Sequence, residues 1–150
     1  MIVYLDSSTL ARVYLVDEPG HDEAAALIED PEIVLVTGTW TRIEVSGALV
    51  RAARAGRRHA DPGPLLDLLD NDLGPDGPVT VLIADQTTIE TEALALVRTH
   101  AIRAMDAWHL AVASLTLPQL AEPGEQRGFA TNDVLRRDVA RRLGFVPIPE

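Results

Sequence analysis

The chain has 150 residues, of which 47% are hydrophobic, and a formal net charge of −10. Such a chain can bury one core, so a single domain spanning residues 1–150 is expected. The absence of cysteine excludes a disulfide framework, thiolate zinc sites and a cysteine nucleophile, and the negative charge argues against general binding to a phosphate backbone. No apolar run approaches the roughly 18 residues of a membrane span, and no signal peptide is evident, so we expect a cytoplasmic protein without membrane contact.

Short apolar runs alternate with amphipathic stretches in the first half of the chain. The first run ends at Asp6, and the following helix is expected to begin with a hydroxyl-bearing cap from Ser7 or Ser8. In chain order, we predict a strand at 2–5, helices at 10–16 and 21–29, a strand at 33–36, a helix from Thr39 or Thr41 towards residue 56, a linker at 61–64 and a short helix at 65–69.

The same alternation continues through the second half. In chain order, we predict a strand at 79–83, a helix at 86–100, a helix that opens near residue 106 and reaches 115, a loop at 117–125, a strand at 128–131, a helix at 134–143 and a strand at 145–148. Pro147 cannot donate to a β-ladder, which places the last strand at an edge. Apolar strands between amphipathic helices predict an α/β fold, namely a three-layer α/β/α sandwich around a mostly parallel central sheet.

Four carboxylates are expected to meet at one edge of this sheet. Asp6 and Asp133 each follow a predicted strand, while Glu44 and Asp106 lie near the starts of helices. The carboxyl ends of parallel strands share an edge, where ligands bind in open α/β sheets. Carboxylates at short range favour protonation of some members unless a cation binds them. Oxygen ligands without cysteine indicate Mg²⁺, with Mn²⁺ possible, and a site suited to phosphoryl-ester hydrolysis.

Four segments, in this order, resemble the PIN domain family and more narrowly the VapC-type toxins of bacterial toxin–antitoxin modules. They are residues 2–8 (IVYLDSS), 41–45 (TRIEV), 103–111 (RAMDAWHLA) and 129–133 (FATND). The resemblance extends over essentially the whole chain. It implies a PIN-like fold and a Mg²⁺-dependent endoribonuclease that hydrolyses RNA phosphodiester bonds as a toxin. It also implies an RNA substrate, a cognate VapB-type antitoxin and a homodimer.

By position, the resemblance implies a catalytic, metal-binding site formed by Asp6, Glu44, Asp106 and Asp133. Asp6 and Asp106 would ligate the metal, and Asp133 would ligate it directly or through water. Glu44 would hold a second metal or a metal-bound water. Asp138 is a less favoured substitute for Asp133, because it lies a full turn deeper in the predicted helix.

Other side chains in these segments have supporting or structural interpretations. Ser8 and Thr131 match positions where the family often has hydroxyls, and we expect them to support the ligands through hydrogen bonds. His109 shares a helix face with Asp106 and is expected to be packed or bonded to a partner rather than to a metal. Trp108 is bulkier than the leucine or small residue typical of the family, which leaves its packing open. Trp40 and Trp108 are interpreted as core or interface residues.

The basic residues are all arginine and form two groups. One group contains Arg51, Arg54, Arg57 and Arg58, and the other contains Arg136, Arg137, Arg141 and Arg142. Such groups are commonly solvated helix faces. The functional interpretation is contact with RNA phosphates or with the antitoxin, for which Arg51, Arg54, Arg136 and Arg137 are the candidates.

Local and functional alternatives remain open at the sequence level. Asp6 could be only an Asx turn or a helix cap, and Asp106 and Asp133 could be helix caps. Glu44 could pair with Arg42 or Arg51 on a solvated face. The absence of lysine argues against a receiver-type phosphoacceptor domain and a haloacid-dehalogenase-type phosphatase. The alternative function is a PIN-fold binding module with little or no cleavage activity, which acts by binding the antitoxin or RNA.

Overall fold

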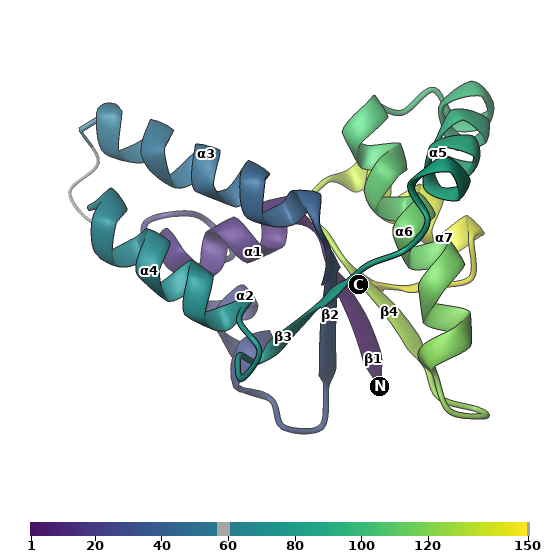
Figure 1. Cartoon of the computed structure of the whole chain (residues 1–150), viewed down its shortest axis with the longest axis horizontal. Coiled ribbons are helices and arrows are strands. Elements are labelled where there is room, and N and C mark those ends of the chain that lie inside the picture. Colours follow the sequence, from purple (N-terminus) through teal and green to yellow (C-terminus); the bar gives the residue numbers. More distant parts are fainter. Residues whose placement is uncertain (57–60, 150) are drawn as a thin grey trace.

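The computed structural model describes residues 1–56 and 61–149, and these residues form an α/β fold (Figure 1). Each predicted strand lies within two residues of its expected position. In chain order the elements are β1 (Ile2–Leu5), α1 (Ser7–Tyr14), α2 (His21–Glu29), β2 (Val34–Gly38), α3 (Trp40–Arg54), α4 (Pro62–Asp72), β3 (Val79–Leu82), α5 (Gln86–His100), α6 (Ala104–Leu120), β4 (Arg127–Ala130), α7 (Val134–Arg142) and β5 (Val146–Ile148).

The strands form one parallel sheet in the order β3-β2-β1-β4-β5. β1 lies at the centre, where Tyr4 is opposite Val36 of β2 and Phe129 of β4. On one side of β1 lie β2 and then β3, and on the other side lie β4 and then β5. The carboxyl end of β1 is therefore beside a topological switch point, where open α/β sheets bind ligands. β5 lies at an edge, as Pro147 predicts.

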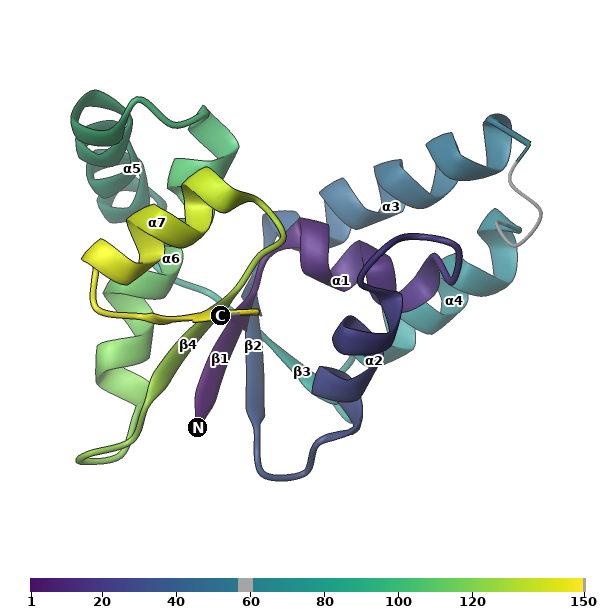
Figure 2. The ribbon, with the colours of Figure 1, turned by 180° about the vertical axis from the view of Figure 1, so that it is seen from behind.

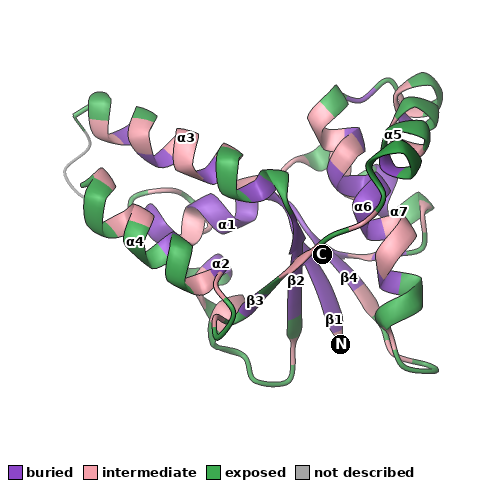
Figure 3. Cartoon of the chain, viewed as in Figure 1, coloured by how far each residue is buried: buried purple, intermediate pink, exposed green. Residues whose placement is uncertain are grey.

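Helices cover both faces of the sheet, which confirms the three-layer α/β/α architecture. Helices α1 to α4 lie on one face, and α5, α6 and α7 lie on the other (Figures 1 and 2). The side chains of β1 alternate between the two cores, with Val3 and Leu5 facing α1, α3 and α4, and Ile2 and Tyr4 facing α5, α6 and α7. The central strands are buried, while the outer turns of the helices are exposed (Figure 3).

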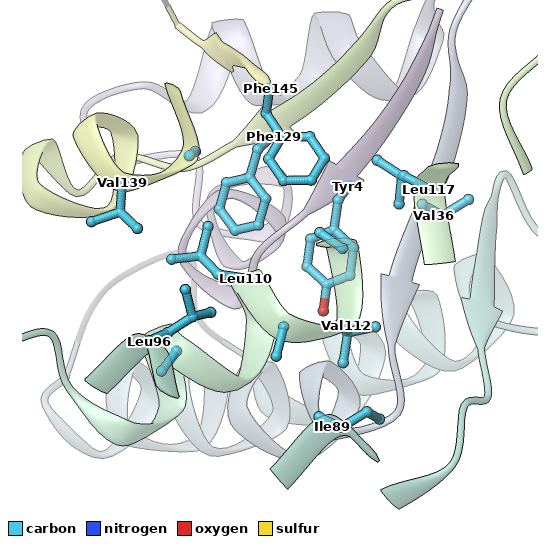
Figure 4. Close-up of a cluster of buried hydrophobic side chains, with 14 of the residues drawn as sticks. Tyr4, Val36, Ile89, Leu96, Leu110, Val112, Leu117, Phe129, Val139 and Phe145 are labelled. Carbon is cyan, nitrogen blue, oxygen red and sulfur yellow. The ribbon is translucent and has the colours of Figure 1, made fainter. Parts of the chain in front are cut away.

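The core against α6 contains the bulkier aromatic side chains. Tyr4 stacks on Phe129 with ring centroids 5.3 Å apart and planes inclined by 5°, and Phe145 packs on Phe129 at 6.1 Å (Figure 4). Leu110 and Leu117 of α6 are fully buried in the same cluster. None of the helices in the described part of the chain is both long and apolar enough to cross a membrane.

The cap of α1 differs from the predicted hydroxyl cap. Asp6 itself is the N-cap residue, because its Oδ1 accepts a hydrogen bond from the Thr9 backbone N–H at 2.8 Å. The Ser8 hydroxyl donates to the same oxygen at 2.8 Å. A carboxylate is as good a cap as a hydroxyl and is further stabilised by the helix dipole. Asp6 therefore combines the local capping role with a place at the carboxyl edge of the sheet.

Two helices are longer than predicted, and each extension contains proline. α4 begins at Pro62, inside the predicted linker, because proline at the first helical position lacks only an N–H that would be unpaired there. Asp61 caps this start by accepting the Gly63 N–H at 3.1 Å. α6 continues through Pro118 to Leu120, where a loop was predicted from residue 117. Pro118 removes one helical hydrogen bond near the helix end, and the burial of Leu117 holds the last turn in place.

The fully buried position of Leu110 predicts a large loss of stability on truncation. Leu110→Ala should lower the free energy of unfolding by about 2–5 kcal/mol, because it removes buried methyl groups and leaves a cavity. Leu68→Ala is the matched control, since Leu68 of α4 is 51% exposed, and it should cost less than about 1 kcal/mol. Denaturant unfolding measures both values. Equal losses in the two variants would contradict the assigned core.

Candidate active site at the carboxyl edge of the sheet

The structure brings the four predicted acids to the carboxyl edge of the sheet. Asp6 follows β1 and caps α1, and Asp133 follows β4 and caps α7 by accepting the Arg136 backbone N–H at 3.0 Å. Because β1 and β4 are parallel neighbours, the chain passes into both helices at the same end of the sheet (Figure 2). Glu44 lies in the second turn of α3. Asp106 is the third residue of α6, whose cap residue is Arg103, so Asp106 is not a cap.

Asp6 and Asp106 converge on one cationic side chain, Arg136 of α7. The Arg136 guanidinium donates a hydrogen bond to Oδ2 of Asp6 through Nη1 and forms an ion pair with Asp106, in which Nη2 lies 2.9 Å from Oδ1. The Asp6 side chain is fully buried, and that of Arg136 is 11% exposed. Arg136 Nε is also buried and has no hydrogen-bond partner among the described residues. Arg136 therefore lies inside the acidic site, whereas the sequence pattern grouped it with outward-facing arginines.

Burial and the neighbouring charges together shift the pKa of Asp106. Burial raises the pKa of Asp106 above its usual range; the Arg136 guanidinium opposes this shift, while Asp133 and Asp6 add to it. A carboxylate that raises the pKa of a neighbouring carboxyl lies within effective electrostatic range of it. Asp6 and Asp133 therefore lie close enough to Asp106 to interact with it electrostatically.

Glu44 is held by a buried histidine from the opposite helical layer. His109 of α6 lies 2.6 Å from Glu44 Oε2 through Nε2 and 2.9 Å from the Tyr4 hydroxyl through Nδ1. Burial alone would raise the pKa of Glu44, but the hydrogen bond and charge of His109 lower it overall, with smaller contributions from Ser7 and Arg136. His109 is 1% exposed. It is thus a packed, partner-bonded residue, as the sequence analysis expected.

Hydroxyl groups support the backbone and carboxylates of the site. The Ser8 hydroxyl donates to Asp6 and lies 3.4 Å from the Asn132 N–H, which approaches it as a donor. Thr131 Oγ1 accepts the Asp133 backbone N–H at 3.2 Å. In addition, the Thr37 hydroxyl donates to the Leu5 carbonyl at 2.7 Å, a contact across β1 and β2 that the sequence pattern did not indicate. These hydrogen bonds hold the carboxyl ends of β1, β2 and β4 beside the acids.

Trp108 packs where β2 ends in a glycine. A Cβ at Gly38 would lie 2.7 Å from the Trp108 ring and 2.8 Å from the Tyr4 hydroxyl, so only glycine leaves room for both side chains. Trp108 also packs edge-on against His109, with centroids 5.4 Å apart. Trp40, which is 44% exposed, lies 6.1 Å from Trp108 at the rim of an apolar hollow of about 370 Å³. The large residue at position 108 is therefore accommodated without displacing the acids.

The remaining arginine candidates lie outside the acidic cluster. Arg51 and Arg54 are exposed on the last turns of α3, and Arg51 lines a hollow of about 310 Å³ together with Ser7, Ser8 and Glu44. Arg57 and Arg58 lie outside the described residues.

The arginines of α7 beyond Arg136 make their own contacts. Arg137 reaches the Pro149 carbonyl at 3.4 Å, and Arg141 pairs with Asp138 at 3.0 Å on an exposed face. Asp138 is thus engaged away from the site and does not take the place of Asp133.

The carboxylates suit a hard divalent cation by their chemistry. Asp6 and Asp106 already direct oxygens at one positive group, and both are oxygen donors of the kind that Mg²⁺ and Mn²⁺ prefer. No group of three or more histidine, aspartate or glutamate side chains is assembled for a metal within residues 1–56 and 61–149. Asp6 and Asp106 could therefore hold a cation together with Asp133 or Glu44 after Arg136 has moved aside.

Comparison with known proteins identifies both a family and a similar fold. The family model described as "PIN domain" matches residues 3–117. A chain in the structure of VapBC-1 from nontypeable Haemophilus influenzae superposes with a TM-score of 0.54 at 18% sequence identity, over 98% of this chain and 96% of that chain. This likeness is one of fold. No curated protein matches the chain significantly in sequence.

The buried ion pair predicts a strong dependence of stability on Arg136. Arg136→Met should lower the free energy of unfolding by about 3–5 kcal/mol, because it leaves the buried Asp6 carboxylate without a counter-charge. Arg137→Met, at the next position of α7, is the control and should cost less than about 1 kcal/mol. Denaturant unfolding measures both. Adding Asp6→Asn to Arg136→Met should recover much of the loss, and a double variant as unstable as Arg136→Met would contradict this assignment.

The Glu44–His109 bond should contribute stability that depends on pH. The pKa of Glu44 is lowered from 4.5 in the folded protein, so its ionisation stabilises the fold above that value and the stabilisation is lost as the pH falls through the folded-state pKa. Near about pH 6 the wild type should exceed Glu44→Gln by about 1 kcal/mol in unfolding free energy, and this difference should shrink below about pH 4. Unfolding curves across this range test it. Glu29→Gln, exposed at the end of α2, should show no such trend, and the same trend in both variants would count against the pair.

Proposed function

The chain belongs to the PIN domain family, and from this premise we propose that it is a metal-dependent endoribonuclease that acts as the toxin of a toxin–antitoxin pair. PIN domains are generally nucleases. The observation that carries the proposal is the convergence of the Asp6 and Asp106 carboxylates on a single buried cationic group, with Glu44 and Asp133 at the same edge of the sheet. Such a cluster suits a site that binds a divalent cation and a phosphodiester.

Each acid has a distinct part in the proposed reaction. Asp6 and Asp106 would hold Mg²⁺ or Mn²⁺, and Asp133 would complete the site directly or through water. The bound ion would polarise the scissile phosphate and lower the pKa of a water molecule. Glu44, fixed by His109, would orient the attacking water or a second ion. Ser8 would keep the Asp6 carboxylate in one orientation, since its hydroxyl donates to Oδ1.

Arg136 would move from the carboxylates to the substrate when the cation binds. In the structure its guanidinium pairs with Asp6 and Asp106, and its Nε has no partner among the described residues. A divalent cation would take over that pairing. The guanidinium would then be available to a phosphate oxygen, which it can bind with two parallel hydrogen bonds. Arg51 would contact the RNA backbone or the antitoxin from the neighbouring hollow, and Arg54 and Arg137 are further candidates.

The proposed partners follow from the same family assignment. We propose a cognate VapB-type antitoxin, because the similar fold occurs in a VapBC structure, and a homodimer. The exposed apolar side chains of Trp40 and Leu94, which line one hollow, support the presence of a partner surface. A cytoplasmic location remains part of this proposal.

One observation favours the second candidate, a PIN-fold binding module with little or no cleavage activity. Arg136 fills the space between Asp6 and Asp106, and the described residues contain no preassembled group of three metal-binding side chains. If Arg136 stayed in place, the acids would serve stability alone. The two functions differ in whether added Mg²⁺ or Mn²⁺ supports RNA cleavage.

Cleavage of cellular RNA with mapping of the new 5′ ends tests the proposed function. With Mg²⁺ or Mn²⁺ the wild type should produce defined ends, and Asp6→Asn and Asp106→Asn should each reduce cleavage by at least about 100-fold, because each removes a metal-binding charge. Asp67→Asn, exposed on α4, is the matched control and should cleave like the wild type. Excess EDTA should stop the reaction. Cleavage that persists in EDTA, or in either site variant purified in parallel, would exclude a metal-dependent nuclease.

A further inference from the structure

His109 is a buried polar side chain whose two ring nitrogens are both engaged. It projects from α6 on one side of the sheet and meets Glu44 of α3, which belongs to the other helical layer. Its second nitrogen meets Tyr4, whose side chain lies in the core against α6 and is fully buried. The three side chains form one chain of hydrogen bonds from the hydrophobic core to the carboxyl edge of the sheet.

The chemistry of Glu44 assigns the direction of its hydrogen bond with His109. An ionised Glu44 can only accept, so His109 Nε2 carries the hydrogen and donates to Oε2 at 2.6 Å. The Tyr4 hydroxyl lies 2.9 Å from Nδ1 and can act there as donor or acceptor. A hydrogen on Nε2 therefore satisfies the bond to Glu44, and the bond to Tyr4 forms whichever of its two atoms donates. This arrangement leaves neither nitrogen available to ligate a metal.

Two aromatic side chains pack against the His109 ring. Tyr4 lies edge-on to it with centroids 5.8 Å apart, and Trp108 lies edge-on at 5.4 Å with planes inclined by 87°. Gly38 permits this close packing, because a Cβ there would collide with both aromatic side chains. A residue needed only to fill this space could be apolar, yet the position holds an imidazole that reaches a partly exposed carboxylate.

We propose that His109 is a positioning residue for Glu44, whose carboxylate it holds through Oε2 at the carboxyl edge of the sheet, while Tyr4 fixes the ring from the core. This inference rests on the proposed function, in which Glu44 acts at the site. His109 itself touches neither substrate nor cation. Its contribution is to restrict one carboxylate to a single orientation, as hydrogen-bond partners do for metal-ligating groups.

Two substitutions of His109 separate this role from packing. His109→Gln places an amide NH₂ near the former Nε2 and can still donate to Glu44, whereas His109→Asn reaches only the Tyr4 side. Mn²⁺ affinity, followed by electron paramagnetic resonance, and RNA cleavage should fall about 10–100-fold in His109→Asn. His109→Gln should stay within about fivefold of the wild type, and the KM for RNA should change little in either variant. Similar melting temperatures would establish that both variants fold.

Tyr4→Phe and the Glu44→Gln background complete the test. Tyr4→Phe should cause a smaller loss of Mn²⁺ affinity than His109→Asn, because the bond to Glu44 remains. In a Glu44→Gln background, His109→Asn should have no further effect on Mn²⁺ affinity or cleavage. Equal losses in His109→Gln and His109→Asn, or an undiminished effect of His109→Asn in the Glu44→Gln background, would assign His109 to packing and overturn the proposal.

Nitrogen-15 chemical shifts of the His109 ring distinguish failure of this inference from failure of the proposed function. In the absence of added metal, the wild type should have a protonated Nε2, whatever the state of Nδ1 and whether or not the protein cleaves RNA. A hydrogen found on Nδ1 alone would overturn the positioning role. Absence of both Mn²⁺ binding and cleavage in the wild type, with the expected chemical shifts, would instead reject the nuclease function and, with it, the role of Glu44 that this inference needs.

Discussion

The burial of the Asp6 carboxylate at the carboxyl end of β1 is the constraint on which the rest of the site depends. A buried carboxylate requires a counter-charge and hydrogen-bond donors. The Asp6 carboxylate accepts hydrogen bonds from the backbone N–H of Thr9, the hydroxyl of Ser8 and the guanidinium of Arg136. Because Arg136 also pairs with Asp106, one cation links the starts of α1 and α6 to α7. The stability of this edge and its proposed chemistry therefore use the same charges.

Stability and the proposed function therefore make opposing demands on Arg136. The guanidinium that pairs with Asp6 and Asp106 stands between two carboxylates that a divalent cation would need. A divalent cation in its place would bring two positive charges where the guanidinium brings one, so both carboxylates would keep a counter-charge. Burial raises the pKa of Asp106, and Asp133 and Asp6 add to this rise against the opposing charge of Arg136.

The two helical layers are joined at the same edge by Tyr4, His109 and Glu44. Tyr4 stacks on Phe129 in the core and also bonds His109, so the position of a site carboxylate is coupled to core packing. Gly38 makes the coupling possible by allowing the aromatic rings to approach the backbone of β2. An active site at the switch point of a parallel sheet benefits from such stiffness, because its groups come from elements that are distant in sequence.

The strands, their parallel arrangement and the edge at which the acids meet could all be predicted from the sequence. Apolar runs of four or five residues between longer amphipathic stretches favour buried parallel strands, and residues that follow parallel strands lie at the same edge of the sheet. Helix ends were less determined, since Pro62 and Pro118 are compatible with a helix only near its ends, and tertiary packing decides where those ends lie.

The partner of each charged group could not be predicted from the sequence and is set by the assembled fold. Arg136 was indistinguishable in sequence from its neighbour Arg137, yet one enters the acidic cluster and the other reaches a terminal carbonyl. Glu44 had arginines nearby in sequence and instead bonds a histidine 65 positions away. Local patterns report which face of a helix is apolar, but ion pairs depend on distances between elements that only the assembled fold sets.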